Sequence, residues 1–104
     1  MSILVFTVTC PDPDAASDIA DDLLVRRLAA RATLHPPVES HYRALDGVDY
    51  SEEITLTLIT RPELETAVEF AIRGLHPYDM PPILRHEERA NADYEAWVMA
   101  ETGG

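Results

Sequence analysis

The segment Leu75–Leu84, LHPYDMPPIL, lies between a run with helical periodicity and the last apolar stretch before the C-terminal region. It contains three prolines, and each proline fixes its own φ and moves the residue before it towards extended geometry. The segment is therefore predicted to be a stiff, extended connector that holds the side chains of His76, Tyr78 and Asp79 in set directions. Such a connector either contributes side chains to a binding site or only directs the chain into a sheet.

Length and composition indicate one folded domain over residues 1–104, with 46% hydrophobic and 26% charged residues. The chain has 19 acidic and 8 basic residues, a formal net charge of −11, and all of its basic residues are arginine. An acidic surface repels phosphate backbones, so we expect no nucleic-acid partner. No apolar run approaches the ~20 residues of a membrane span. We expect no membrane association and, because the run Ile3–Phe6 lacks a basic flank, a cytoplasmic location.

The first predicted strand, Ile3–Thr9, is apolar on both of its alternating faces. Ile3, Val5 and Thr7 form one face, and Leu4, Phe6 and Val8 form the other. A strand of this kind is buried on both sides. Helices of the same chain can cover one face, and a chain this short has little left to cover the second. The pattern therefore indicates an oligomer.

The next segments alternate between helical and strand patterns. Asp12-Pro13 predicts a helix start, followed by apolar residues at helical spacing as far as Leu28 and by late arginines that include Arg27 and Arg31. Ala32–Tyr42, interrupted by Pro36-Pro37, predicts an edge strand. The turn Leu45–Asp49 then leads into a strand over Glu53–Thr60.

The second half repeats the pattern. Thr60-Arg61-Pro62-Glu63 resembles a capping box, and the helix that follows is predicted to end at Gly74. Pro82–His86 predicts the fourth strand and Asn91–Glu101 a final helix. The order predicts an α+β fold: a ferredoxin-like βαββαβ sandwich with an antiparallel four-stranded sheet, plus a C-terminal helix.

Several side chains are candidates for chemistry. His76 either caps the carbonyl groups at a helix C-terminus or binds a metal ion. Two His–carboxylate pairs at strand spacing, Glu39 with His41 and His86 with Glu88, either share a metal or form solvated edges. Cys10 excludes an internal disulfide, and the acidic residues near it oppose a thiolate. The sequence shows no paired nucleophile and base, so an enzyme is not expected.

Four motifs stand out along the chain: Thr9-Cys10-Pro11-Asp12, His76-Pro77-Tyr78, Pro81 and Asp93-Tyr94-Glu95-Ala96-Trp97. They occur in the order seen in the CutA family, the divalent-cation tolerance proteins, which this chain resembles over nearly its whole length. The resemblance implies a ferredoxin-like homotrimer with a role in metal tolerance. It also implies His76 as a ligand of Cu(II) or another divalent cation. Tyr78 and Glu53, the latter resembling a family glutamate at the start of the third strand, would complete a ligand site.

The chain departs from the family pattern at polar positions. Arg31 stands where family members often carry cysteine, Ile59 where they carry lysine, and Pro82 where they carry glutamate. The missing cysteine disfavours binding of Cu(I), because thiolates select that ion. An alternative is a trimeric small-molecule sensor of the PII type, although the acidic segment Leu45–Glu53 disfavours the anionic effectors of those proteins.

Overall fold

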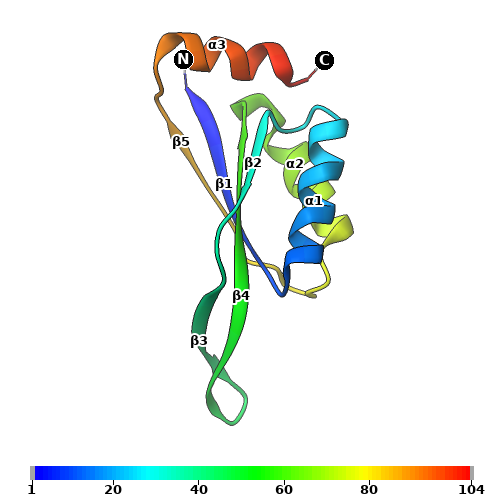
Figure 1. The fold of residues 1–104 in the computed structure, drawn as a ribbon, viewed down its shortest axis with the longest axis vertical. Helices are drawn as coiled ribbons and strands as arrows, with labels where there is room; N and C mark the ends of the chain where they lie inside the picture. The colour runs from blue at the N-terminus through cyan, green and yellow to red at the C-terminus, as the bar shows by residue number, and fades with distance from the viewer. Residues whose placement is uncertain (1, 104) are drawn as a thin grey trace.

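A computed structural model describes residues 2–103 of the chain (Figure 1). Five strands, three α-helices and a short 3-10 turn follow one another in an α+β arrangement. Their bounds are β1 Ile3–Cys10, α1 Pro13–Val25, β2 Arg31–Leu34, β3 Val38–Ala44, β4 Gly47–Thr60, η1 Pro62–Leu64, α2 Glu65–Leu75, β5 Ile83–Glu88 and α3 Ala92–Glu101.

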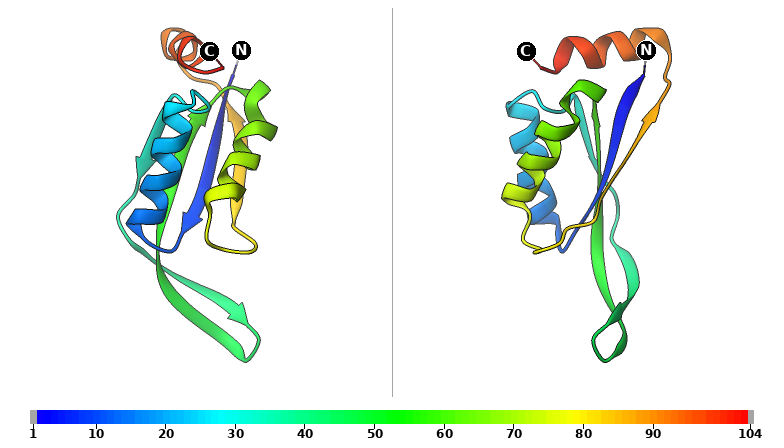
Figure 2. Two further views of the ribbon diagram at one scale, coloured as in Figure 1. Left: turned by 90° about the vertical axis from the view of Figure 1, so that its right-hand side faces the viewer. Right: turned by 180° about the vertical axis from the view of Figure 1, so that it is seen from behind.

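The sheet has the order β2-β4-β1-β5 with antiparallel pairing throughout, and β3 pairs with the outer half of β4. Both α1 and α2 pack on one face of this sheet, as Figure 2 shows. The side chains between the two layers are fully buried, among them Phe6, Val8, Leu56 and Leu58. The predicted ferredoxin-like fold with a C-terminal helix is therefore confirmed, with the edge strand divided into β2 and β3 at His35–Pro37.

The second face of the sheet is covered only at one end. Ile3 and Val5 pack there with Val98 of α3, so the same chain supplies the cover that the sequence analysis assigned to another subunit. Farther along this face, Thr7 and Thr9 of β1 and Thr55 and Thr57 of β4 are only partly buried. The apolar second face of β1 is thus explained by α3, which lies across the end of the sheet (Figure 1).

The β3–β4 hairpin extends beyond the body of the domain, opposite α3 (Figure 1). It makes the molecule elongated, with extents of 48 × 23 × 23 Å. Strand β4 begins at Gly47, earlier than the predicted Glu53, and residues 41–50 are all exposed. The prediction was too short because no core lies beneath this part of the strand to impose an apolar alternation. Gly47, at φ 124°, follows the turn in a conformation that favours glycine.

Three predicted helix boundaries were wrong. Helix α1 ends at Val25, because Arg27 adopts a φ of 60° and reverses the chain, and Arg31 belongs to β2. The Thr60 hydroxyl does not cap a helix but donates to the Leu28 carbonyl at 2.7 Å. Helix α2 continues through Gly74 and stops at Leu75, since His76 precedes a proline and is extended.

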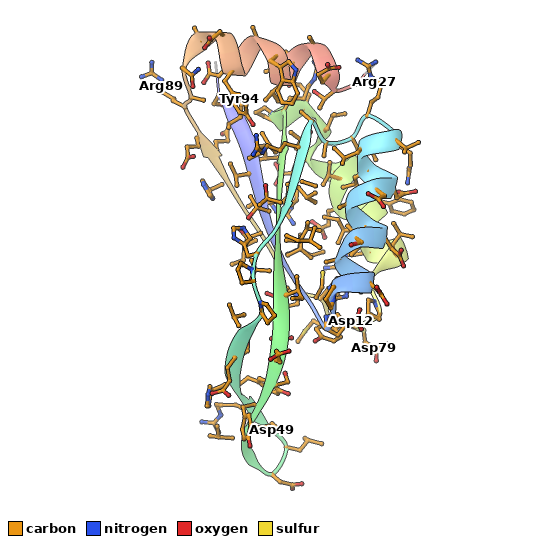
Figure 3. All side chains as sticks on the ribbon, viewed as in Figure 1. Asp12, Arg27, Asp49, Asp79, Arg89 and Tyr94 are labelled. Carbon is orange, nitrogen blue, oxygen red and sulfur yellow. The ribbon has the colours of Figure 1, made fainter. Side chains whose placement is uncertain are left out.

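The C-terminal end of α3 is anchored to the domain by two arginines. Arg61 donates to the carbonyl groups of Met99 (2.9 Å) and Thr102 (2.6 Å) and to the Thr102 hydroxyl (3.2 Å). Arg27 donates to the Ala100 carbonyl at 2.7 Å, and it lies beside this end of α3 in Figure 3. These bonds satisfy carbonyl groups that the helix itself leaves free. No helix among residues 2–103 is long and apolar enough to cross a membrane.

We predict that Arg61→Ala lowers the free energy of unfolding by about 1–3 kcal/mol, because partly buried carbonyl groups lose their charged donor. Urea denaturation would show this as a lower transition midpoint. Arg89→Ala is the matched control: Arg89 is exposed and points away from the body in Figure 3, so a change within about 0.5 kcal/mol is expected. Equal midpoints for the two variants would contradict the anchoring role.

Candidate functional site

The connector between α2 and β5 is held against the end of β1 by His76. Its ring nitrogen Nε2 lies 2.7 Å from the Thr9 carbonyl, and the Tyr78 backbone N–H donates to Nδ1 at 3.1 Å. Because Nδ1 accepts, the proton of the neutral ring is on Nε2 and is donated to Thr9. His76 is 8% exposed. Both ring nitrogens are engaged within the chain, and neither bond goes to the helix carbonyls that one interpretation proposed.

Tyr78, held by this bond, reaches across to β4. Its hydroxyl donates to Glu53 Oε2 at 2.6 Å, and the Glu53 residue as a whole is 8% exposed. Burial, and then the hydrogen bond to the Glu53 carboxylate, raise the pKa of the Tyr78 hydroxyl well above its usual value. The tyrosine therefore stays protonated and remains a donor to the carboxylate. The structure places in contact two residues that the family resemblance assigned to one ligand site.

A hollow of about 520 Å³ opens beside this pair. One wall comes from the ends of β1 and the connector, and the other from the β3–β4 hairpin. The lining residues are Thr9, Ser40, Tyr42, Arg43, Glu53, Tyr78, Met80 and Pro82. His76 is not among them and lies behind Tyr78, so in this arrangement it positions the wall of the hollow.

The residues of β3 in this hollow were missed by sequence reasoning. The register pairs Val38 with Glu53 and Ser40 with Ser51, which places Ser40 and Tyr42 on the same face of the hairpin as Glu53. The hairpin itself was predicted, and an explicit register counted back from its turn would have pointed to these side chains.

Cys10 lies at the end of β1 and is fully buried. Burial, followed by the charges of Asp12 and Glu53, raises the pKa of its thiol to about 11. The thiol is therefore protonated near neutral pH, where the thiolate would be the nucleophile and the metal ligand.

The two His–carboxylate pairs form but lie on different strands. His41 Nε2 is 2.7 Å from Glu39 Oε2 on β3, and His86 Nε2 is 3.3 Å from Glu88 Oε1 on β5, and all four side chains are exposed. The structure does not bring the two pairs together, because β3 and β5 are at opposite edges of the sheet. Within residues 2–103, no three His, Cys, Asp or Glu side chains are grouped so as to hold a metal ion.

Comparison with known proteins gives a consistent result. Residues 4–101 match the family described as CutA1 divalent ion tolerance protein. A divalent-cation tolerance protein CutA from Pyrococcus horikoshii is 35% identical over 101 residues, covering 96% of this chain and 97% of the relative. The crystal structure of CutA1 from Ehrlichia chaffeensis superposes with a TM-score of 0.94 at 28% identity, covering 98% of this chain and 96% of the other.

Some curated relatives are longer than this chain. A CutA homolog from Xenopus laevis is 33% identical over 92 residues, and this match covers 88% of the chain but only 61% of that relative.

We predict that Tyr78→Phe lowers the free energy of unfolding by about 1–3 kcal/mol, because the buried Glu53 carboxylate loses its donor. The exposed Tyr50, whose relative exposure is 65%, supplies the control Tyr50→Phe, for which little change is expected. Chemical denaturation of the three proteins near neutral pH measures the difference. A Tyr78→Phe variant as stable as Tyr50→Phe would contradict the assigned bond.

The same bond predicts a dependence on pH. The pKa of Tyr78 is raised on folding, so its contribution is fully present below the unfolded tyrosine value of about 10 and is lost as the pH rises through the folded value. The stability advantage of the wild type over Tyr78→Phe should therefore be retained up to about pH 10 and decline above it.

Proposed function

Because the chain belongs to the CutA1 family of divalent ion tolerance proteins, we propose that it is a non-enzymatic, cytoplasmic binding protein that acts in divalent-cation tolerance as a homotrimer. The observation that carries the proposal is Glu53, a residue that is 8% exposed, whose carboxylate accepts from Tyr78 and which forms part of the wall of a hollow. A buried carboxylate is costly unless a donor or a cation compensates it. The protonated state of Cys10 further supports a binding role over nucleophilic catalysis.

In the proposed site Glu53 supplies the first oxygen ligand of the cation. The hydroxyl groups of Thr9 and Ser40 line the same hollow and are oxygen ligands of the kind that hard divalent cations accept. One chain provides too few ligands, so water or a neighbouring subunit completes the set. His76, expected from the sequence to bind the metal, would have to release the Tyr78 N–H to free Nδ1. We therefore assign it the role of positioning Tyr78.

The free edges of the sheet support the proposed trimer. Within residues 2–103, strand β5 pairs only with β1, and β2 and β3 pair only with β4, so each side of the sheet has one open edge. Large apolar side chains are exposed along these edges, including Leu84 at 66%, Val38 and Tyr42. Two different edges on one chain suit head-to-tail association, which closes into a ring when the rotation allows.

A second candidate function is a PII-type sensor of small molecules. The observation that favours it is the size of the hollow, which lies within the usual range of small-molecule pockets and is larger than a single ion requires. Tyr42, Met80 and Pro82 also give it apolar surface that a hydrated metal ion does not use.

We predict that the metal-free protein binds Zn²⁺, Cu²⁺ or Ni²⁺ with saturation near one ion per chain in isothermal titration. Glu53→Gln should weaken this binding about tenfold or more. The amide can still accept from the Tyr78 hydroxyl, so this variant removes charge with little change in shape. Glu52→Gln, at the exposed neighbouring position, is the control for loss of one acidic charge and should bind as the wild type does.

His76→Ala tests the metal assignment of that residue in the same experiment. Binding that survives in a folded His76→Ala protein agrees with a positioning role, whereas complete loss of binding agrees with a ligand. Weak, salt-sensitive binding that is equal in Glu53→Gln and Glu52→Gln would mean that the acidic surface only collects cations. That outcome would overturn the proposed site.

Sedimentation equilibrium tests the assembly. We predict a species of three times the chain mass of 11.6 kDa that persists to low micromolar concentration. Leu84→Glu, on the open edge strand β5, should shift it towards monomer, because a charge would be buried at the contact. Glu88→Gln on the same strand is the control. A wild-type protein that is monomeric across the concentration range contradicts the proposal.

A further inference from the structure

We propose that the hollow beside Glu53 and Tyr78 binds a small organic ammonium ion, an amine with a short apolar body. This inference rests on the proposed function only in using the same site, and it names a ligand class that differs from a bare metal ion. Three features of the hollow support it: a Glu53 carboxylate with only one hydrogen bond among residues 2–103, two tyrosine rings, and an apolar wall.

The Glu53 carboxylate can accept a further hydrogen bond from a cationic ligand. Tyr78 occupies Oε2 of Glu53, and among residues 2–103 no other hydrogen bond reaches this side chain. The Tyr78 proton stays on the tyrosine, because the pKa of its hydroxyl is raised, so the Glu53 group remains an acceptor. A ligand N–H bearing positive charge would donate a charge-assisted hydrogen bond to the Glu53 carboxylate, and such bonds are stronger than those between neutral groups.

The walls of the hollow favour an organic cation over a hydrated metal. Tyr42 and Tyr78 both line it, and aromatic rings attract ammonium groups through their π faces. Met80 and Pro82 add apolar surface for a short carbon chain. A bound metal ion would leave this apolar surface exposed to water. No group of three acidic, histidine or cysteine side chains within residues 2–103 is arranged to hold a metal ion, so a metal needs further ligands from water or a neighbouring subunit, whereas an ammonium group does not.

No lysine of the chain can supply the ammonium group. All eight basic residues are arginine, so no lysine side chain of a second copy can enter the hollow. The formal net charge of −11 raises the local concentration of cations of every kind. Selectivity for an amine therefore has to come from the contacts of the hollow, and a matched neutral compound can test it.

The test is a titration of the ¹⁵N-labelled full chain followed by amide chemical shifts. The probes are n-butylammonium, its neutral counterpart butan-1-ol, and potassium as a salt control. We expect saturable shifts that cluster at Ser40–Arg43, Glu53 and Tyr78–Met80 with n-butylammonium only. Shifts of equal size with butan-1-ol, or shifts with potassium that match those with n-butylammonium, would overturn the inference.

Three variants make the test specific. Glu53→Gln should weaken n-butylammonium binding about tenfold or more, whereas Glu52→Gln should leave it unchanged. Tyr42→Ser removes one aromatic wall at a half-exposed position, so the fold should tolerate it even if Glu53→Gln does not fold. It should weaken n-butylammonium binding. Unchanged n-butylammonium affinity in Tyr42→Ser would contradict the inference.

A parallel Zn²⁺ titration separates the two proposals. Binding of n-butylammonium without saturable Zn²⁺ binding retains the inference and rejects the metal site. Zn²⁺ binding without n-butylammonium binding retains the metal site and rejects the inference. If both bind, n-butylammonium at saturation should lower the apparent affinity for Zn²⁺, because both require the Glu53 carboxylate.

Discussion

The neutral ring of His76 is the contact on which the arrangement of the candidate site depends. Its Nε2–H is donated to the carbonyl at the end of β1, and its Nδ1 accepts the backbone N–H of Tyr78. The connector after α2 is joined to β1 by this ring and, at its far end, by a bond from the Thr9 N–H to the Pro82 carbonyl at 3.3 Å. With the connector in place, the Tyr78 side chain reaches β4 and the Glu53 carboxylate. Protonation of the ring would add a donor at Nδ1, where an acceptor is needed.

Electrostatics then determines what the site can bind. The Glu53 carboxylate accepts a hydrogen bond from Tyr78 within a residue that is 8% exposed. Burial, followed by the charges of Asp12 and Glu53, raises the pKa of the nearby Cys10 thiol to about 11. With its thiol protonated near neutral pH, the site presents oxygen and not sulfur to a ligand. Hard or organic cations suit such a site better than Cu(I) does.

Local sequence signals predicted those parts of the fold that depend on local physics. Asp12-Pro13 begins α1 as expected, with the Asp12 side chain accepting from the Ala15 N–H at 2.8 Å. The apolar alternation of Glu53–Thr60 appears in the buried half of β4. The end of α2 was predicted from Gly74. The helix instead ends because His76, the residue before Pro77, is extended. The dipeptide His76-Pro77 contained that information.

Other features depend on tertiary contacts that no short pattern encodes. Thr60 and Arg61 resembled a helix cap, but their side chains serve Leu28 and the end of α3, more than thirty residues away in each case. The cover of Ile3 and Val5 by α3 likewise requires the C-terminal helix to cross the sheet. Glu53 and Tyr78 were selected by family resemblance, whereas Ser40 and Tyr42 follow only from the register of the hairpin.

The hairpin connects the candidate site to assembly. It supplies one wall of the hollow through Ser40, Tyr42 and Arg43, yet its outer part lies over no core of its own chain. A two-stranded ribbon without such support is marginally stable in water. Contact with a second copy would order the hairpin, and a ligand between the hairpin and Tyr78 would favour the same conformation. Binding and assembly would then be thermodynamically linked, because each would lower the ordering cost that the other has to meet.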